Sequence, residues 1–201
     1  MIDIDQEKYD IFKKNNHNFS LLMNKFIFQN DSFKNFFVSQ EKSNYEFYCF
    51  LSKNSKDIFS ITQIGCCGGY FLGTYLCFNN EIEEITVAST KNNNNQILRL
   101  TKNNLLNFKN VKKNYSTEID NSFLKKEIIS DILIIFDNIF ILDYIDDILL
   151  CFLNNKDIKY LILDNLKDDL NFENKIKNFS IIKSISFQKF KKRNDIIILR
   201  K

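Results

Sequence analysis

Proline and tryptophan are absent from this 201-residue chain, alanine occurs once, and only four glycines are present. Asparagine, lysine, isoleucine and phenylalanine dominate instead, which is the residue set that an AT-rich genome encodes. Under such a bias, a glycine that persists has a physical reason more often than not. The usual reasons are a backbone with positive φ or a close approach of the backbone to a ligand.

Histidine also occurs only once, as His17 in a polar stretch, and this count excludes a histidine-based triad or a multi-histidine metal site. The five cysteines form no Cys-X-X-Cys pair and no Cys/His ligand spacing. An odd number of cysteines without a signal peptide indicates a reducing compartment. We therefore expect a cytoplasmic protein.

Long apolar runs and clustered positive charge are missing as well. No apolar stretch reaches the roughly 18 residues that a membrane span requires, because aspartates interrupt the longest candidate, residues 132–153. The net charge of +3 is spread along the sequence, whereas a nucleic-acid binder carries a clustered basic patch. These absences predict a partner that is neither a membrane nor a nucleic acid.

All four glycines lie within nine residues, at positions 65, 68, 69 and 73. An apolar run, 58–64, precedes the cluster and an apolar segment, 70–78, follows it, which predicts a strand, a glycine-rich turn and a helix. In open α/β sheets a nucleotide-like ligand binds at such a turn. A P-loop is excluded because no Lys-Ser/Thr pair follows the glycines. The dinucleotide pattern GxGxxG fails at Cys67 and Tyr70.

The rest of the chain divides into two parts. Residues 1–57 carry aromatic residues at helical spacing and predict a helical N-terminal extension. Residues 58–201 alternate between strand and helix patterns and predict one α/β domain. The expected strands are 58–64, 84–88, 111–115, 131–136, 158–163, 179–187 and 195–199, and the expected helices are 70–78, 93–107, 143–153 (with Asp143 as N-cap) and 168–177. This order predicts a doubly wound, mostly parallel seven-stranded sheet with a terminal antiparallel strand.

The run 61–72 resembles the first motif of class I S-adenosylmethionine-dependent methyltransferases, an apolar strand followed by an acidic residue and GxGxG. Residues 87–90 and 131–138 are similar to later strand ends of that family. The resemblance covers residues 58–201 and implies a Rossmann-like fold, S-adenosylmethionine as cofactor, and methyl transfer to a small molecule or sugar. It assigns cofactor binding to Gln63, Gly65, Cys66, Gly68, Gly69, Ser89 and Thr90.

Three positions depart from the family pattern. Gln63 stands at the acidic position, Cys67 replaces the middle glycine, and Ala88 falls where an acid accepts hydrogen bonds from the ribose hydroxyls. Ser89 or Thr90 is expected to substitute for that acid. The departures leave two alternatives open, a degenerate methyltransferase-like binding or scaffold module, and transfer of the aminocarboxypropyl group of the same cofactor.

Acid–amide pairs follow two predicted central strands, Asp137-Asn138 and Asp164-Asn165. Asp137 and Asn138 are the catalytic candidates. Asp137, Asp164 and Asn165 are also similar to the magnesium ligands of catechol-type O-methyltransferases, so a Mg²⁺ site, a metal-free contact with the acceptor and plain turn residues all remain open. The aromatic residues of 1–57 are expected to form a lid that walls the acceptor pocket.

Overall fold

The structure, a computed structural model, describes residues 57–66, 69–79, 81–91, 95–106, 108–126, 128–163, 170–189 and 196–201. The predicted N-terminal extension and lid, residues 1–57, lies outside the described residues except for its last residue, Asp57. The chain divides into two compact units. The larger unit comprises residues 57–69 and 81–201, and the smaller one contains residues 70–80.

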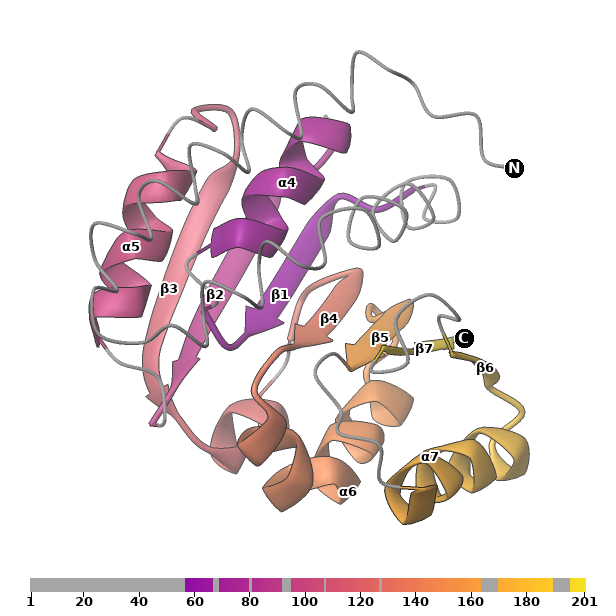
Figure 1. The fold of residues 1–201 in the computed structure, drawn as a ribbon. Helices are drawn as coiled ribbons and strands as arrows, with labels where there is room; N and C mark the ends of the chain where they lie inside the picture. Colours follow the sequence, from indigo (N-terminus) through magenta and orange to yellow (C-terminus); the bar gives the residue numbers. More distant parts are fainter. Residues whose placement is uncertain are drawn as a thin grey trace. The chain divides into compact units, whose positions relative to one another are not determined.

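Seven strands form one sheet in the larger unit (Figure 1). They are β1 (Ser60–Ile64), β2 (Glu84–Thr90), β3 (Lys112–Ile119), β4 (Ile132–Ile135), β5 (Tyr160–Leu163), β6 (Ser186–Lys189) and β7 (Ile197–Arg200). Their order is β3-β2-β1-β4-β5-β7-β6, and β7 runs antiparallel to both of its neighbours, β5 and β6. The predicted α/β fold with a terminal antiparallel strand is confirmed.

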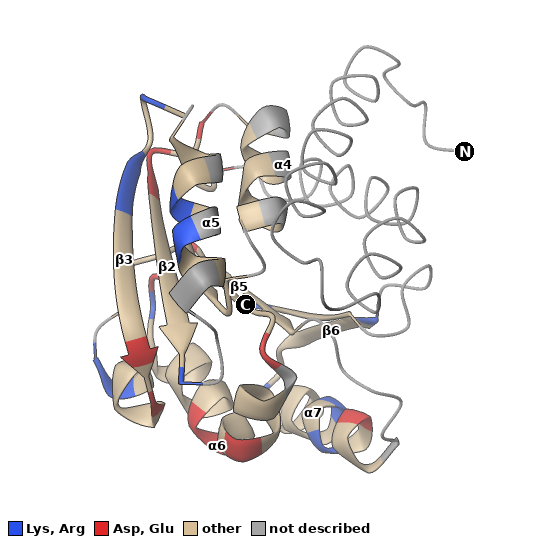
Figure 2. Cartoon of the chain, turned by 60° about the vertical axis from the view of Figure 1, so that its left-hand side comes forward, with Lys and Arg blue, Asp and Glu red and all other residues tan. Residues whose placement is uncertain are grey.

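The helices are α4 (Tyr70–Phe78), α5 (Asn95–Leu105), the 3-10 helix η2 (Asn121–Lys125), α6 (Asn138–Asn154) and α7 (Leu170–Ile182). Of these, α4 belongs to the smaller unit. Residues of η2, α6 and α7 share one apolar cluster with alternate residues of the strands, so these helices cover one face of the sheet. Helix α5 lies beside β2 and β3 on the other face (Figure 2). No described helix has the length and apolar character of a membrane span.

The central strands are apolar because both of their faces are covered. Every residue of β4 and β5 is buried. Strand β1 differs, because Thr62 and Gln63 are fully or almost fully buried polar residues within it. A buried polar side chain requires hydrogen-bond partners, and those of Gln63 lie in the glycine loop that follows.

Several predicted elements were wrong in extent; strand β3, for example, continues to Ile119 rather than ending at residue 115. Helix α6 begins at Asn138 rather than at Asp143, and its N-cap is Asp137, whose side chain accepts a hydrogen bond from the Phe140 N–H. The backbone leaves helical geometry at Tyr144 (φ −127°, ψ 23°), so the predicted start coincides with a kink. Aspartate suits position 137, because its side-chain oxygen satisfies a free N–H group at the start of a helix.

The residues predicted as a strand from 179 to 187 belong partly to helix α7, which continues to Ile182. Ile176 and Ser180 are both buried, which is the spacing of one helical face rather than of a strand. The helix ends where Ser184 adopts a left-handed backbone (φ 54°), and β6 begins two residues later.

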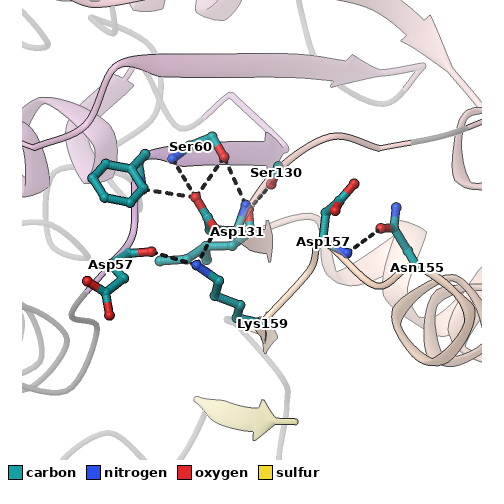
Figure 3. A network of polar contacts seen from close by, with 9 residues as sticks. Asp57, Ser60, Ser130, Asp131, Asn155, Asp157 and Lys159 are labelled. Atoms are coloured by element: carbon teal, nitrogen blue, oxygen red, sulfur yellow. Dashed lines mark hydrogen bonds and ion pairs between the residues drawn. The ribbon is translucent and has the colours of Figure 1, made fainter.

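At the amino edge of the sheet, Asp131 joins the starts of three adjacent strands (Figure 3). Its Oδ2 accepts hydrogen bonds from the Phe59 N–H at 2.9 Å, the Ser60 N–H at 3.0 Å and the Ser60 hydroxyl at 2.9 Å. Its Oδ1 lies 2.8 Å from Lys159 Nζ, just before β5. Burial alone would raise the pKa of Asp131, but these donors outweigh burial and hold the pKa below its ordinary value.

We expect Asp131→Asn to lower the free energy of unfolding by about 1–3 kcal/mol at pH 7, because it weakens charge-assisted hydrogen bonds. Since the pKa of Asp131 is lower in the folded state, its contribution is present above the unfolded pKa of about 3.9 and is lost as pH falls through the folded value. Urea unfolding of both proteins from pH 7 to pH 3 measures this difference. A difference that does not shrink toward pH 3 would contradict it. Lys159→Met, which removes a partly exposed partner, serves as the milder control.

Candidate functional site

The glycine loop leaves the sheet at the carboxyl end of β1, between β2 and β4. The connections from β1 and β4 run to opposite sides, so this is the switch point of the sheet, where ligands of open α/β folds bind. Gly65 and Gly69 both have left-handed backbones, with φ of 92° and 77°. Gly68 and Cys67 lie outside the described residues.

Close packing within the protein also requires both glycines. A Cβ atom at Gly65 would lie 3.1 Å from the Asp137 backbone nitrogen and 3.2 Å from Phe136 Cβ. A Cβ atom at Gly69 would lie 3.3 Å from three atoms of Thr101 on α5. The glycines therefore have a structural reason to persist, which applies before any ligand binds. Sequence reasoning missed Thr101, since nothing in the pattern of α5 distinguishes it.

The Gln63 side chain lies fully buried beneath this loop. Its Nε2 donates to the Gly65 carbonyl oxygen at 2.5 Å and to the Cys66 carbonyl oxygen at 3.2 Å. The Cys66 carbonyl also accepts from the Gly69 N–H at 2.8 Å and closes a tight turn. Gln63 Oε1 is buried and has no hydrogen-bond partner among the described residues. The predicted site residues Gln63, Gly65, Cys66 and Gly69 thus form one hydrogen-bonded group.

The end of β2 places three residues beside the loop. The Ala88 carbonyl accepts the Gly65 N–H at 2.9 Å, while the Ala88 side chain is fully buried in the apolar cluster shared with α6. A carboxylate at position 88 would be buried in that cluster, so Ala88 is not the place where an acid would serve a ligand. Ser89 and Thr90 extend β2 beyond the last residue of β1.

The Cys66 thiol forms a hydrogen bond with Ser89 at the end of β2. Burial raises the pKa of the Cys66 thiol to about 11, although a hydrogen bond with Ser89 and the charge of Lys102 act in the opposite direction. At neutral pH the thiol is protonated, and a protonated thiol is a poor nucleophile. Cys66 therefore contributes packing and backbone groups to the site.

Asp137 and Thr90 meet above the end of β1. The Thr90 hydroxyl donates to Asp137 Oδ2, and the Phe140 N–H donates to Asp137 Oδ1 at 2.9 Å. Both side chains are nearly buried, with exposures of 2% for Thr90 and 8% for Asp137. The structure thus joins a predicted cofactor residue to a predicted catalytic residue, and it gives Asp137 a helix-capping role. The Asn138 side chain is outside the description, and the catalytic assignment of Asp137 and Asn138 remains a prediction.

The second acid–amide pair, Asp164-Asn165, lies outside the described residues. Within the part of the chain that the structure describes, no group of three or more His, Cys, Asp or Glu side chains is arranged to hold a metal ion. On α6, Asp146 forms an ion pair with Lys175, and Asp147 accepts a hydrogen bond from the Asn121 side chain.

Comparison with known proteins finds similarity in structure alone. No family model matches the chain, and no curated protein matches its sequence. A Podospora anserina methyltransferase, PaMTH1, bound to S-adenosylhomocysteine, has a TM-score of 0.56 at 11% identity, over 79% of this chain and 77% of that one. A precorrin-6y C5,15-methyltransferase from Geobacter metallireducens also reaches 0.56, at 14% identity, over 78% and 88%. M. capricolum TrmK, in complex with S-adenosylhomocysteine, reaches 0.52 at 15% identity, over 77% and 67%.

These similarities agree with the strand order β3-β2-β1-β4-β5-β7-β6 and the antiparallel β7. At such low identity they establish the fold and not the activity. The chain has the Rossmann-like fold of the class I S-adenosylmethionine-dependent methyltransferases.

Proposed function

We propose that this chain binds S-adenosylmethionine and transfers its methyl group to a small molecule or sugar. The observation that carries the proposal is the glycine loop, whose Gly65 and Gly69 have left-handed backbones and lie at the switch point of a methyltransferase-type sheet. The structural neighbours PaMTH1 and TrmK have this fold, and both structures contain bound S-adenosylhomocysteine. The spread of charge along the sequence supports an acceptor that is not a nucleic acid.

Some of the residues at the site have side chains that can form hydrogen bonds with the polar groups of this cofactor. Gln63 Oε1 is a buried acceptor without a partner among the described residues, and a buried acceptor in this state favours a donor from a ligand or water. Ser89 and Thr90 supply hydroxyls at the end of β2, where the family has an acid. We assign the loop to the amino-acid end of the cofactor and these two hydroxyls to its ribose.

Thr90 is suited to accept a hydrogen bond even though it is neutral. Its single hydroxyl hydrogen is donated to Asp137 Oδ2, so its remaining lone pairs act only as acceptors. A hydroxyl that donates to a carboxylate becomes a better acceptor through polarisation. Asp137 thereby supplies negative charge to the end of β2 from the neighbouring side of the crevice.

When bound, the cofactor supplies an electrophilic methyl group. The contribution of the chain is alignment, because displacement at carbon depends mainly on the geometry of the nucleophile relative to the methyl group. Asp137 uses both carboxylate oxygens for Phe140 and Thr90. We therefore assign Asp137 and Asn138 to contact with the acceptor rather than to proton abstraction.

A binding module without catalysis is the second candidate. It is favoured by the absence of an acid among Gln63, Ser89 and Thr90 and by the low exposure, 2%, of both Ser89 and Thr90. Calorimetric titration with S-adenosylmethionine, followed by product analysis with candidate acceptors, separates the two functions. Product analysis also detects transfer of the aminocarboxypropyl group.

We expect S-adenosylhomocysteine to bind near the micromolar-to-millimolar boundary, about 4–8 kcal/mol, and Gly65→Ala to weaken it at least tenfold. The substitution also costs about 1–3 kcal/mol of stability, because it places a side chain at positive φ against the Asp137 backbone. Calorimetry and thermal unfolding measure the two effects. Gly73→Ala, inside α4, is the matched control and should leave binding unchanged. Absence of a melting-temperature shift in the unmodified protein at millimolar ligand would contradict the proposal.

Thr90→Val should weaken S-adenosylhomocysteine about 5- to 10-fold, since it removes the acceptor that Asp137 orients and costs about 1 kcal/mol. Thr90→Ser keeps the hydroxyl and should stay within about threefold of the unmodified protein. Titration of the three proteins gives the ratio. Equal binding by Thr90→Val and the unmodified protein would mean that the ribose is held elsewhere.

A further inference from the structure

Gln63 stands where the methyltransferase resemblance places an acid, and its hydrogen bonds have the opposite polarity to those of an acid. Its Nε2 donates to the carbonyls of two consecutive loop residues, Gly65 at 2.5 Å and Cys66 at 3.2 Å. An ionised carboxylate only accepts hydrogen bonds. The orientation of the amide is determined by its partners, because the reverse orientation would place Oε1 against both carbonyl oxygens.

These two carbonyls control the shape of the loop. Gly65 has a left-handed backbone, and the Cys66 carbonyl accepts a hydrogen bond from the Gly69 N–H. Thr101 Oγ1 lies 3.2 Å from the same Cys66 oxygen. Gln63 is therefore the side chain that bridges the start and the middle of the turn. It does so from a position with no exposure to solvent, where a lost hydrogen bond is not replaced by bulk water.

We propose that Gln63 is a positioning residue, whose amide donors hold the Gly65–Gly69 loop in its ligand-binding conformation. The loop of this chain is thus built around a neutral donor, and an acid at position 63 disrupts the loop instead of restoring a lost ligand contact. The loop's role in ligand binding rests on the proposed function, whereas its dependence on the Gln63 donors does not.

The substitution Gln63→Glu tests this polarity. The new carboxyl group is buried and faces two carbonyl oxygens, and both conditions raise its pKa above the ordinary value of about 4.3. The protonated form donates one hydrogen bond and retains the loop. The ionised form donates none and releases it. Loop order and ligand affinity in this variant should therefore fall as pH rises.

Other titratable groups also face the loop. Their contribution is removed by comparing the variant with the unmodified protein at each pH. They are the Cys66 thiol, whose pKa burial raises to about 11, Lys102 on α5, and Asp137 after β4. Each is present in both the unmodified and the variant protein, so the ratio between the two proteins isolates position 63. Gln188→Glu makes the same chemical change at an exposed position on β6 and is the matched control.

Two measurements are made from pH 5.5 to pH 8 on the full chain. Amide hydrogen exchange gives the protection factor of the Gly69 N–H without ligand, and calorimetry gives the affinity for S-adenosylhomocysteine. For Gln63→Glu relative to the unmodified protein we expect both quantities to fall at least tenfold between pH 5.5 and pH 8. Gln63→Met, which has no donor, should lose both at every pH, and Gln188→Glu should lose neither.

Gln63→Glu with a pH-independent Gly69 protection factor, or Gln63→Met with full protection, overturns the proposal. If the unmodified protein fails to bind S-adenosylhomocysteine, the proposed function falls, and the exchange measurement still decides the role of Gln63. If Gln63→Glu does not fold, the Gln63→Met protein decides it by the same measurement.

Discussion

The chain has to leave the buried centre of the sheet at Gly65, and the site depends on how it does so. The Gly65 N–H stays bonded to β2 through the Ala88 carbonyl, while the Phe136 N–H bonds to the Ile64 carbonyl from the β4 side. Held between both neighbours, Gly65 has room for no side chain, since a Cβ atom would come within 3.1 Å of the Asp137 backbone. Gly65 leaves the strand with a left-handed backbone (φ 92°), which glycine adopts without the steric cost of a side chain.

These backbone hydrogen bonds hold the ends of β2 and β4 close together on either side of the end of β1. The polar residues at those two strand ends therefore interact with one another. Thr90 and Asp137 meet above the end of β1, and Asp137 also caps α6. Gln63 bonds to the loop carbonyls from below. The only carboxylate among these residues is therefore shared between a helix cap and a hydroxyl, and the loop is held by a neutral amide. A site with this arrangement relies on oriented dipoles and hydroxyls more than on net charge.

The opposite edge of the sheet is organised by charge. Asp131 gathers donors from β1 and from the residue before β5, and most of its surface is covered. The charged network that stabilises the fold thus lies at the amino ends of the strands. The candidate site lies at the carboxyl ends, where ligands bind in parallel sheets. Changes at Asp131 and changes at the glycine loop are far apart along the strands, and their effects should be nearly additive.

The order of strands and helices, the glycine turn and the antiparallel end were readable from the sequence, because hydrophobic period and glycine placement are local properties. Helix boundaries were less readable. Asp143 and Asp137 are both good caps by residue type, and only the structure shows that the Asp137 side chain caps α6. Strand period likewise misplaced the residues after Lys177, where Ile176 and Ser180 pack on one helical face.

The sequence by itself determined the fold class and the place of the loop, since both follow from residue patterns along the chain. Only the tertiary structure decided which polar group meets which. Thr90 and Asp137 are 47 residues apart, and the pairing of Ile64 with Ala88 turns Ala88 into the core and leaves Ser89 and Thr90 beyond the end of β1. Register between these strands depends on which hydrophobic faces pack together across the sheet, and those faces belong to residues far apart along the chain.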